Sequence, residues 1–161
     1  MAIPEKLLLI TQQLAVSGNR IDKAIEDLAD DDFYRCPETA NHMLWLLGHA
    51  ANSRLGLVVL MGGEDQCPWA ELFSRGSQPG DRETLPPVSE VRDSWNAAVA
   101  ALNTHFETLS DADLSKTCSR EFPIGDKTVL GAAMFLAGHE MYHLGQMTVL
   151  KKWLGQRQLV G

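Results

Sequence analysis

Apolar residues recur at intervals of three and four along four long segments of this 161-residue chain, residues 4–30, 39–61, 87–109 and 128–155. That spacing places apolar side chains on one face of an α-helix, and no stretch shows a convincing strand alternation. Each of four such helices must bury one face against the others. The sequence therefore predicts an all-α fold, a four-helix bundle with long inter-helix loops, formed as a single domain over residues 1–161.

Residue types at the segment ends predict where the helices start and what lies between them. Thr39 or Asn41 is expected to cap the second helix, and Thr128 is expected to cap the last. Residues 62–86 are rich in Gly, Pro and charge, and residues 68–73 within them could form one short helix. A loop of this length inside a compact domain is often functional, so we expect it to wall a pocket.

The last segment carries two histidines on its apolar stripe. His139 and His143 are four residues apart, so they lie on the same helix face one turn apart. The rest of the stripe is apolar: Leu136, Met147, Leu150 and Leu154. Neutral imidazoles in a core need polar partners, and one metal ion would supply a partner to both. Because such sites usually have at least three protein ligands and no His, Cys, Asp or Glu follows His143, the third ligand is expected upstream.

Three upstream histidines could supply that ligand: His42, His49 and His105. His42 and His49 are seven residues apart, two turns along one face of the second helix and about 10 Å apart, so only one of them can readily join the pair. His105 is expected at the edge of its helix's apolar stripe. Helical phase favours His49 or His42 and does not choose between them.

Two motifs together resemble the DinB-like superfamily. They are the run NHMLWLLGH, residues 41–49, and the run HEMYHLGQ, residues 139–146. The resemblance implies a four-helix bundle, frequent dimers and a divalent metal ion held by three histidines. Matched residue by residue, the ligands of this histidine triad would be His49, His139 and His143, which resolves the choice against His42. Relatives include S-transferases and isomerases that use low-molecular-weight thiols, so the resemblance implies a metal-dependent thiol S-transferase.

The chemistry expected of such a site depends on the metal and its neighbours. Imidazole ligands favour Zn or Ni. A bound cation lowers the pKa of a thiol, and three histidines leave coordination positions open for it. Gln146, one turn beyond His143, could orient a ligand or the substrate. The glycines Gly48, Gly138 and Gly145 cost helix stability, and we expect them to permit close approach of the second and last helices.

Two other functions remain open on the sequence. Residues 139–143 read H-E-x-x-H, so Glu140 could serve as the general base of a metal-dependent hydrolase, although a zinc peptidase normally has its third ligand downstream. Glu140 could equally be a solvated charge on the helix surface. The remaining alternative is a non-catalytic, stress-related dimeric bundle that binds a metal ion.

Charge and cysteine content limit which classes of partner and which cellular compartment are expected. The net charge of −7 and the pI of about 5.1 argue against nucleic acid. No uninterrupted apolar run reaches about 18 residues, and the N-terminus lacks a signal-peptide pattern, so no membrane is expected. The odd number of widely spaced cysteines, Cys36, Cys67 and Cys118, indicates a reduced cytoplasm. We therefore expect a cytoplasmic protein. The resemblance to the DinB-like superfamily further implies a homodimer whose partners are a small-molecule thiol and an electrophile.

Overall fold

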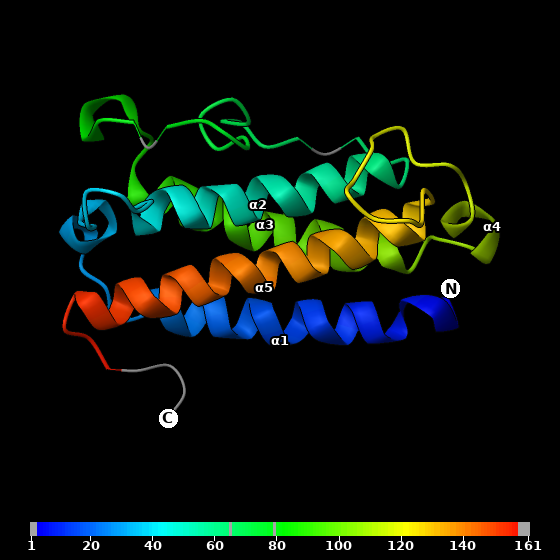
Figure 1. The fold of residues 1–161 in the computed structure, drawn as a ribbon, viewed down its shortest axis with the longest axis horizontal. Helices are drawn as coiled ribbons and strands as arrows, with labels where there is room; N and C mark the ends of the chain where they lie inside the picture. Colours follow the sequence, from blue (N-terminus) through cyan, green and yellow to red (C-terminus); the bar gives the residue numbers. More distant parts are fainter. Residues whose placement is uncertain (1–2, 65, 79, 158–161) are drawn as a thin grey trace.

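Four long helices carry the fold in the computed structural model, which describes residues 3–64, 66–78 and 80–157. They are α1 (Leu8–Ile25), α2 (Met43–Leu60), α3 (Val88–Phe106) and α5 (Val129–Trp153) (Figure 1). Short elements occupy the connections: η1 (Glu5–Leu7), η2 (Asp30–Tyr34), η3 (Arg82–Thr84) and α4 (Asp111–Leu114). The described residues form no strand beyond one isolated bridge between Thr117 and Thr128. The all-α four-helix bundle is confirmed.

The last helix does not simply follow the third around the bundle. α5 packs against both α1 and α2, while α2 packs against α3, so α5 lies between the first and second helices (Figure 1). α5 runs antiparallel to α2 (Figure 1). This long-loop connection brings the C-terminal histidines beside the middle of α2.

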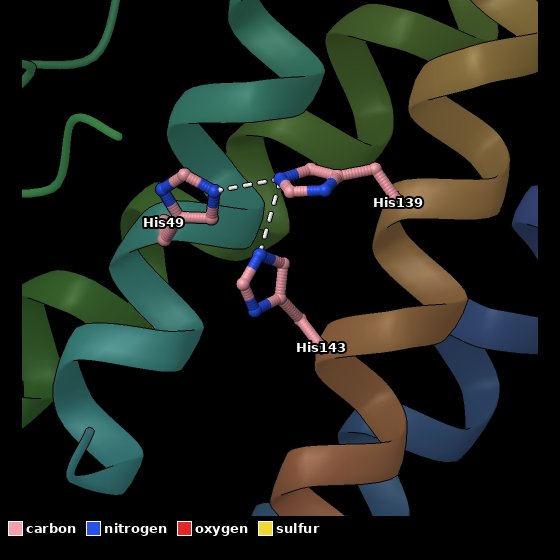
Figure 2. Close-up of side chains that lie close together, drawn as sticks. All are labelled: His49, His139 and His143. Carbon is pink, nitrogen blue, oxygen red and sulfur yellow. Dashed lines mark hydrogen bonds between the residues drawn. The ribbon is translucent and has the colours of Figure 1, made fainter. Parts of the chain in front are cut away.

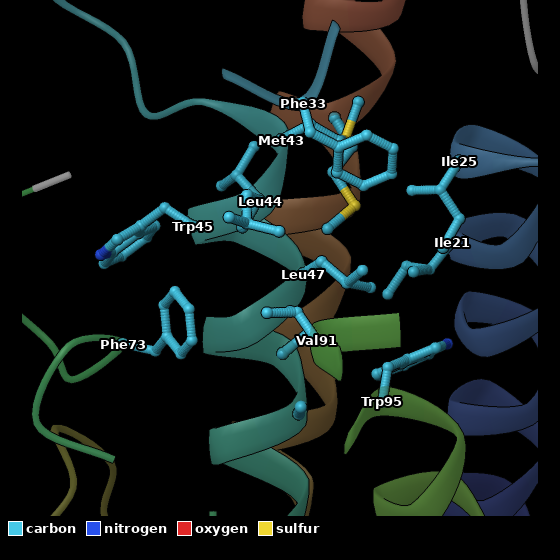
Figure 3. Close-up of a cluster of buried hydrophobic side chains, with 14 of the residues drawn as sticks. Ile21, Ile25, Phe33, Met43, Leu44, Trp45, Leu47, Phe73, Val91 and Trp95 are labelled. Atoms are coloured by element: carbon cyan, nitrogen blue, oxygen red, sulfur yellow. The ribbon is translucent and has the colours of Figure 1, made fainter. Parts of the chain in front are cut away.

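One end of the core is filled by large side chains from several elements. Figure 3 shows Ile21 of α1, Leu47 of α2 and Trp95 of α3 around a common interior, and all three are at most 1% exposed. Phe33 of η2 is fully buried in the same cluster. Burial of large apolar side chains of this kind contributes about 1.5–3 kcal/mol each relative to exposure. A second, separate cluster fills the other end of the bundle and includes Leu14 of α1, Leu57 of α2 and Phe106 of α3.

Several helix ends differ from the prediction. The first helix ends at Ile25 rather than near residue 30, because the chain must turn to bury Phe33 in η2. α2 starts at Met43 and is capped by neither Thr39 nor Asn41. Its cap is His42, whose Nδ1 accepts from Trp45 N–H at 3.0 Å. Residues 68–73 form turns instead of a short helix.

The cap at the start of the last helix is confirmed. The Thr128 hydroxyl accepts from the backbone N–H of Gly131 at 3.2 Å, as expected of an N-cap threonine. Lys151 and Lys152 lie in the last turn of α5, where positive charge complements the helix dipole. The start of the helix that carries two of the candidate ligands is therefore set by its own sequence.

α2 is long and apolar enough to span a membrane by composition alone, with a mean hydropathy of 1.3. However, 72% of Met43–Leu60 is buried inside the bundle, which is the behaviour of a core helix in a globular domain. The helix also carries Arg54, whose side chain is held by contacts within the bundle. The absence of a membrane partner stays a prediction.

Candidate metal centre

Three imidazoles converge between α2 and α5. His49 comes from α2, and His139 and His143 come from successive turns of α5 (Figure 2). The Nε2 atom of His139 lies 3.1 Å from Nε2 of His49 and 3.1 Å from Nε2 of His143. Two nitrogens bound to one zinc ion at about 2.0–2.1 Å, at angles near 90–110°, would be roughly 2.9–3.4 Å apart. The three histidines therefore form a group that could hold a metal ion.

The outer ring nitrogens of two of these histidines are already engaged. His49 Nδ1 lies 2.7 Å from the carbonyl oxygen of Phe73, and His143 Nδ1 lies 2.7 Å from Oε1 of Gln146. Gln146 in turn donates from Nε2 to the hydroxyl of Tyr142 at 3.2 Å, which fixes the direction of its amide. Carbonyl and amide oxygens accept hydrogen bonds and cannot donate them. The Nδ1 atom of His49 and that of His143 therefore each carry the proton, and their Nε2 atoms each present a lone pair.

These tautomers leave too few protons at the centre of the cluster. The lone pairs of His49 and His143 both face the single Nε2 atom of His139, which can donate to only one of them. At least one buried acceptor thus lacks a donor, which costs free energy in a protein interior. A cation would satisfy all three nitrogens at once, so the residues present fit a metal ion.

Burial keeps the three rings neutral. Desolvation lowers the pKa of His49 and His139 below the usual value of 6.5, and it lowers the pKa of His143 to about 4. The neighbouring positive charge of Arg120 lowers the pKa of His49 and His139 further, and that of Arg75 lowers the pKa of His139. Neutral imidazole is the form that binds metal ions, so these three side chains could bind one at neutral pH without first losing protons.

The cluster lies in the wall of a cavity of about 620 Å³. Aromatic rings hold the ligands in place: Trp45 stacks on His49 with centroids 4.8 Å apart, and Phe135 stacks on His139 at 6.0 Å. Two loops complete the wall, through Ser74, Arg75 and Gly76 from one and residues 120–123 from the other. The expectation that the loop over residues 62–86 walls a pocket is confirmed for these three residues.

Glu140 does not face this cavity. Glu140 is 4% exposed, and its carboxylate pairs with Arg54. The Arg54 Nε atom lies 2.7 Å from Oε2, and one of its terminal nitrogens, Nη2, lies 2.8 Å from Oε1. The Ser17 hydroxyl also donates to Oε1. Glu140 follows His139 by one position, about 100° around the helix, so it points toward α1 and α2 instead. Glu140 is thus no solvated surface charge, and the hydrolase that would use it as a base draws no support from this arrangement.

The other histidines lie away from the cluster. His42 caps α2, and the Nε2 atom of His105 lies 3.2 Å from the carbonyl oxygen of Met61. The group identified as able to hold a metal ion thus contains His49 and neither of these two.

The expectation that Gly48, Gly138 and Gly145 permit close approach of α2 and α5 is wrong for all three. A Cβ atom added at Gly138 or Gly145 would meet no described atom within 4 Å, because both residues face outward. Gly48 does permit a close approach, but its neighbour is the ring of Phe73, 2.5 Å from such a Cβ, and not α5. The absence of a side chain at Gly48 lets the loop carbonyl of Phe73 reach His49.

Sequence reasoning missed several residues around the site. Arg54 was one charge in an otherwise apolar helix, which is a usable signal for a buried partner. The carbonyl of Phe73 belongs to the backbone and has no residue-type signature. Arg75 and Arg120 lie in irregular loops, where periodicity gives no indication of which side chains meet.

Comparison with known proteins agrees with the fold and the motifs. The family model described as the DinB superfamily matches residues 13–147, a range that includes all three histidines. A solved structure, described as the crystal structure of the conserved protein of locus from Enterococcus faecalis, is similar in fold with a TM-score of 0.69 at 14% identity. The similarity covers 93% of this chain and 98% of that chain, and at this identity it shows the fold alone. Among curated proteins, none matches the sequence significantly.

Proposed function

This chain belongs to the DinB superfamily, and on that premise we propose that it is a metal-dependent S-transferase for a low-molecular-weight thiol, with one divalent ion held by His49, His139 and His143. The observation that carries the proposal is the convergence of three Nε2 atoms at the wall of a 620 Å³ cavity. A cavity of that size suits a small molecule. Three protein ligands leave positions open on that side, which is the pattern of catalytic rather than structural sites.

The donor set supports zinc or nickel as the metal ion. Imidazole nitrogens favour Zn or Ni, and no carboxylate or thiolate belongs to the described cluster. When bound, such a cation lowers the pKa of a thiol and so supplies thiolate at neutral pH.

The chain's own residues position the reactants. Phe73 and Gln146 hold two of the imidazoles through their Nδ1 atoms, and Trp45 stacks against His49. Phe122 and Phe135, whose ring centroids are 5.1 Å apart, give the cavity an apolar wall for the carbon skeleton of the electrophile. In the transfer, the thiol sulfur forms a bond to the electrophilic carbon while the leaving group departs with its electron pair. The thiol proton leaves to solvent.

A homodimer in the cytoplasm is part of the same proposal. Large apolar side chains are exposed along one face of α5: Met134 at 53%, Tyr142 at 62%, Val149 at 70% and Trp153 at 50%. Their spacing of eight, seven and four residues keeps them near one side of the helix. Exposed apolar stripes of this kind are typical of protein–protein contacts. This face also supports the alternative of a non-catalytic, metal-binding dimer.

The test starts with metal content. Protein purified without a histidine tag should contain about one divalent ion per chain by elemental analysis, and His49→Ala or His143→Ala should lose it, whereas His105→Ala should keep it. Protein reconstituted with Zn, Ni or Mn is then screened for conjugation of electrophiles with several low-molecular-weight thiols. Turnover that disappears with a chelator and with His139→Ala supports the transferase. Full metal occupancy with no turnover for any thiol would favour the non-catalytic alternative.

A further inference from the structure

Two arginines lie in the wall of the histidine cavity without an acidic partner. Arg75 and Arg120 come from the two loops that close the cavity, and neither forms an ion pair with any residue in the described part of the chain. Among the other arginines in the described part of the chain, Arg35, Arg54 and Arg82 each pair with a carboxylate, whereas Arg20 and Arg92 form no ion pair. An unpaired guanidinium is common on a surface, but two in one small cavity need a reason.

The charge of the cavity runs against that of the protein. The chain as a whole carries a net charge of −7, yet the cavity lining contains two arginines, three histidines and a single acidic residue, Glu121. The neutral histidines would leave the charge of a divalent ion uncompensated. A positively charged cavity in a negatively charged protein concentrates the electrostatic field and attracts an anionic ligand.

The loop that carries Arg75 is fastened to α2 on both sides of that residue. On one side the carbonyl of Phe73 bonds His49 at 2.7 Å, and on the other Trp45 Nε1 donates to the hydroxyl of Ser77 at 3.0 Å. The Ser77 hydroxyl also bonds the carbonyls of Leu72 and Ser74, at 2.7 and 2.8 Å. The backbone under Arg75 is therefore held relative to the histidines, which lowers the entropy cost of using its side chain for binding.

Arg120 is also restrained. Its guanidinium carbon lies 5.2 Å from the ring centroid of Phe122, within the range of a cation–π contact. Phe122 is 7% exposed and packs against Phe135, which in turn stacks on His139. A chain of ring contacts thus links the second arginine to the same histidine cluster from the opposite loop.

We infer that this cavity binds a small carboxylate-bearing ligand, whose anionic group is held by Arg75 and Arg120 while its other end reaches the histidine centre. Guanidinium groups present paired donors that match a carboxylate. The inference rests on the proposed function, because it assigns the substrate class of that site. The arginines select the ligand and orient it, and the histidines hold the metal ion.

The test compares two thiols that differ in charge. Cobalt(II) is loaded into the protein, and sulfur binding is followed by the thiolate-to-cobalt charge-transfer band during titration with 3-mercaptopropionate or with neutral 2-mercaptoethanol. We expect 3-mercaptopropionate to bind about tenfold more tightly at low salt, and the preference to shrink at high salt. Arg75→Gln and Arg120→Gln should each reduce the preference several-fold and together abolish it, because they weaken the binding of 3-mercaptopropionate far more than that of 2-mercaptoethanol. Arg20→Gln removes the same charge from the exposed surface of α1 and should change nothing.

The outcomes separate the two proposals. Equal affinities for the two thiols, or a preference that survives the double arginine variant, would overturn the carboxylate site while leaving thiol chemistry standing. If neither thiol gives the charge-transfer band, but propionate alone shifts the cobalt absorption bands in an arginine-dependent manner, the carboxylate site stands and the thiol transferase fails. Cobalt stoichiometry and far-UV circular dichroism of each variant show whether the fold and the histidine centre are intact.

Discussion

The buried ion pair between Arg54 and Glu140 gives the sharpest test of how this bundle is held together. Both side chains are at most 4% exposed. Arg54 makes two hydrogen bonds to the carboxylate and one, at 2.7 Å, to the carbonyl of Leu14, and it lies over the ring of Trp95 at 4.6 Å. The pair therefore joins α2 to α5 and α1 at one point.

Arg54→Met keeps much of the side-chain volume and removes the charge. The Glu140 carboxylate would keep only the Ser17 hydroxyl as a donor among the contacts described above. Breaking a buried pair from one side costs about 3–5 kcal/mol, since it leaves an uncompensated charge in the interior. For a domain of this size we expect the melting temperature to fall by roughly 6–20 °C.

The measurement is urea and thermal denaturation at pH 7, followed by circular dichroism with a chelator present so that metal binding does not mask the change. The matched variant is Arg54→Met combined with Glu140→Gln, which removes both charges. We expect the double variant to be more stable than Arg54→Met alone, because no charge is left buried without a partner. A loss below about 1 kcal/mol in Arg54→Met, or two single losses that simply add in the double variant, would refute the reasoning.

Three further outcomes follow from the site and its surroundings. The pKa of His143 is lowered to about 4 in the folded protein, so as the pH falls this imidazole is protonated first in the unfolded chain. The metal-free protein should therefore lose stability as the pH falls from about 6.5 toward 4. Urea denaturation across that range measures the loss, and a free energy of unfolding that does not change with pH would contradict it. Gln146→Ala removes the acceptor of His143 Nδ1 and should weaken zinc binding about 10–100-fold in a competition assay. Gly48→Ala would place a Cβ against the ring of Phe73 and should destabilise by about 1–3 kcal/mol in urea denaturation, whereas Gly145→Ala, which meets nothing, should stabilise by about 0.5–1 kcal/mol.

Periodicity predicted the helices well, because a repeating apolar stripe is a property of a single segment. It also placed His139 and His143 together, since two positions four apart on one helix share a face in any fold. It did not choose between His42 and His49. Those two share a helical phase, and only the start of α2 at Met43, which makes His42 a cap, distinguishes them. The family motif supplied that choice before the structure did.

The remaining misses concern which neighbour a residue meets. Glu140 and His139 are adjacent in sequence but face different helices, so the pattern H-E-x-x-H alone could not show that the carboxylate pairs with Arg54. The glycines of α5 face outward because the contact between α2 and α5 lies on another side of the helix, and helical phase does not reveal how two helices are rotated against each other. These contacts belong to the tertiary structure, because they depend on packing between segments that are distant in the sequence.

His49 and His143, the two histidines whose Nδ1 atoms are engaged, differ in how substitution can alter their partners. His49 is held by a backbone carbonyl, which every residue type at position 73 would still provide as long as the loop keeps its path. His143 is held by the side chain of Gln146, which one substitution can replace with a charged, shorter or apolar group. The electron-donating strength of the His49 imidazole is thus conserved by the path of the loop backbone, whereas that of the His143 imidazole can be changed by mutation of residue 146. Selection could retune the reactivity of the centre through position 146 while leaving all three histidines in place.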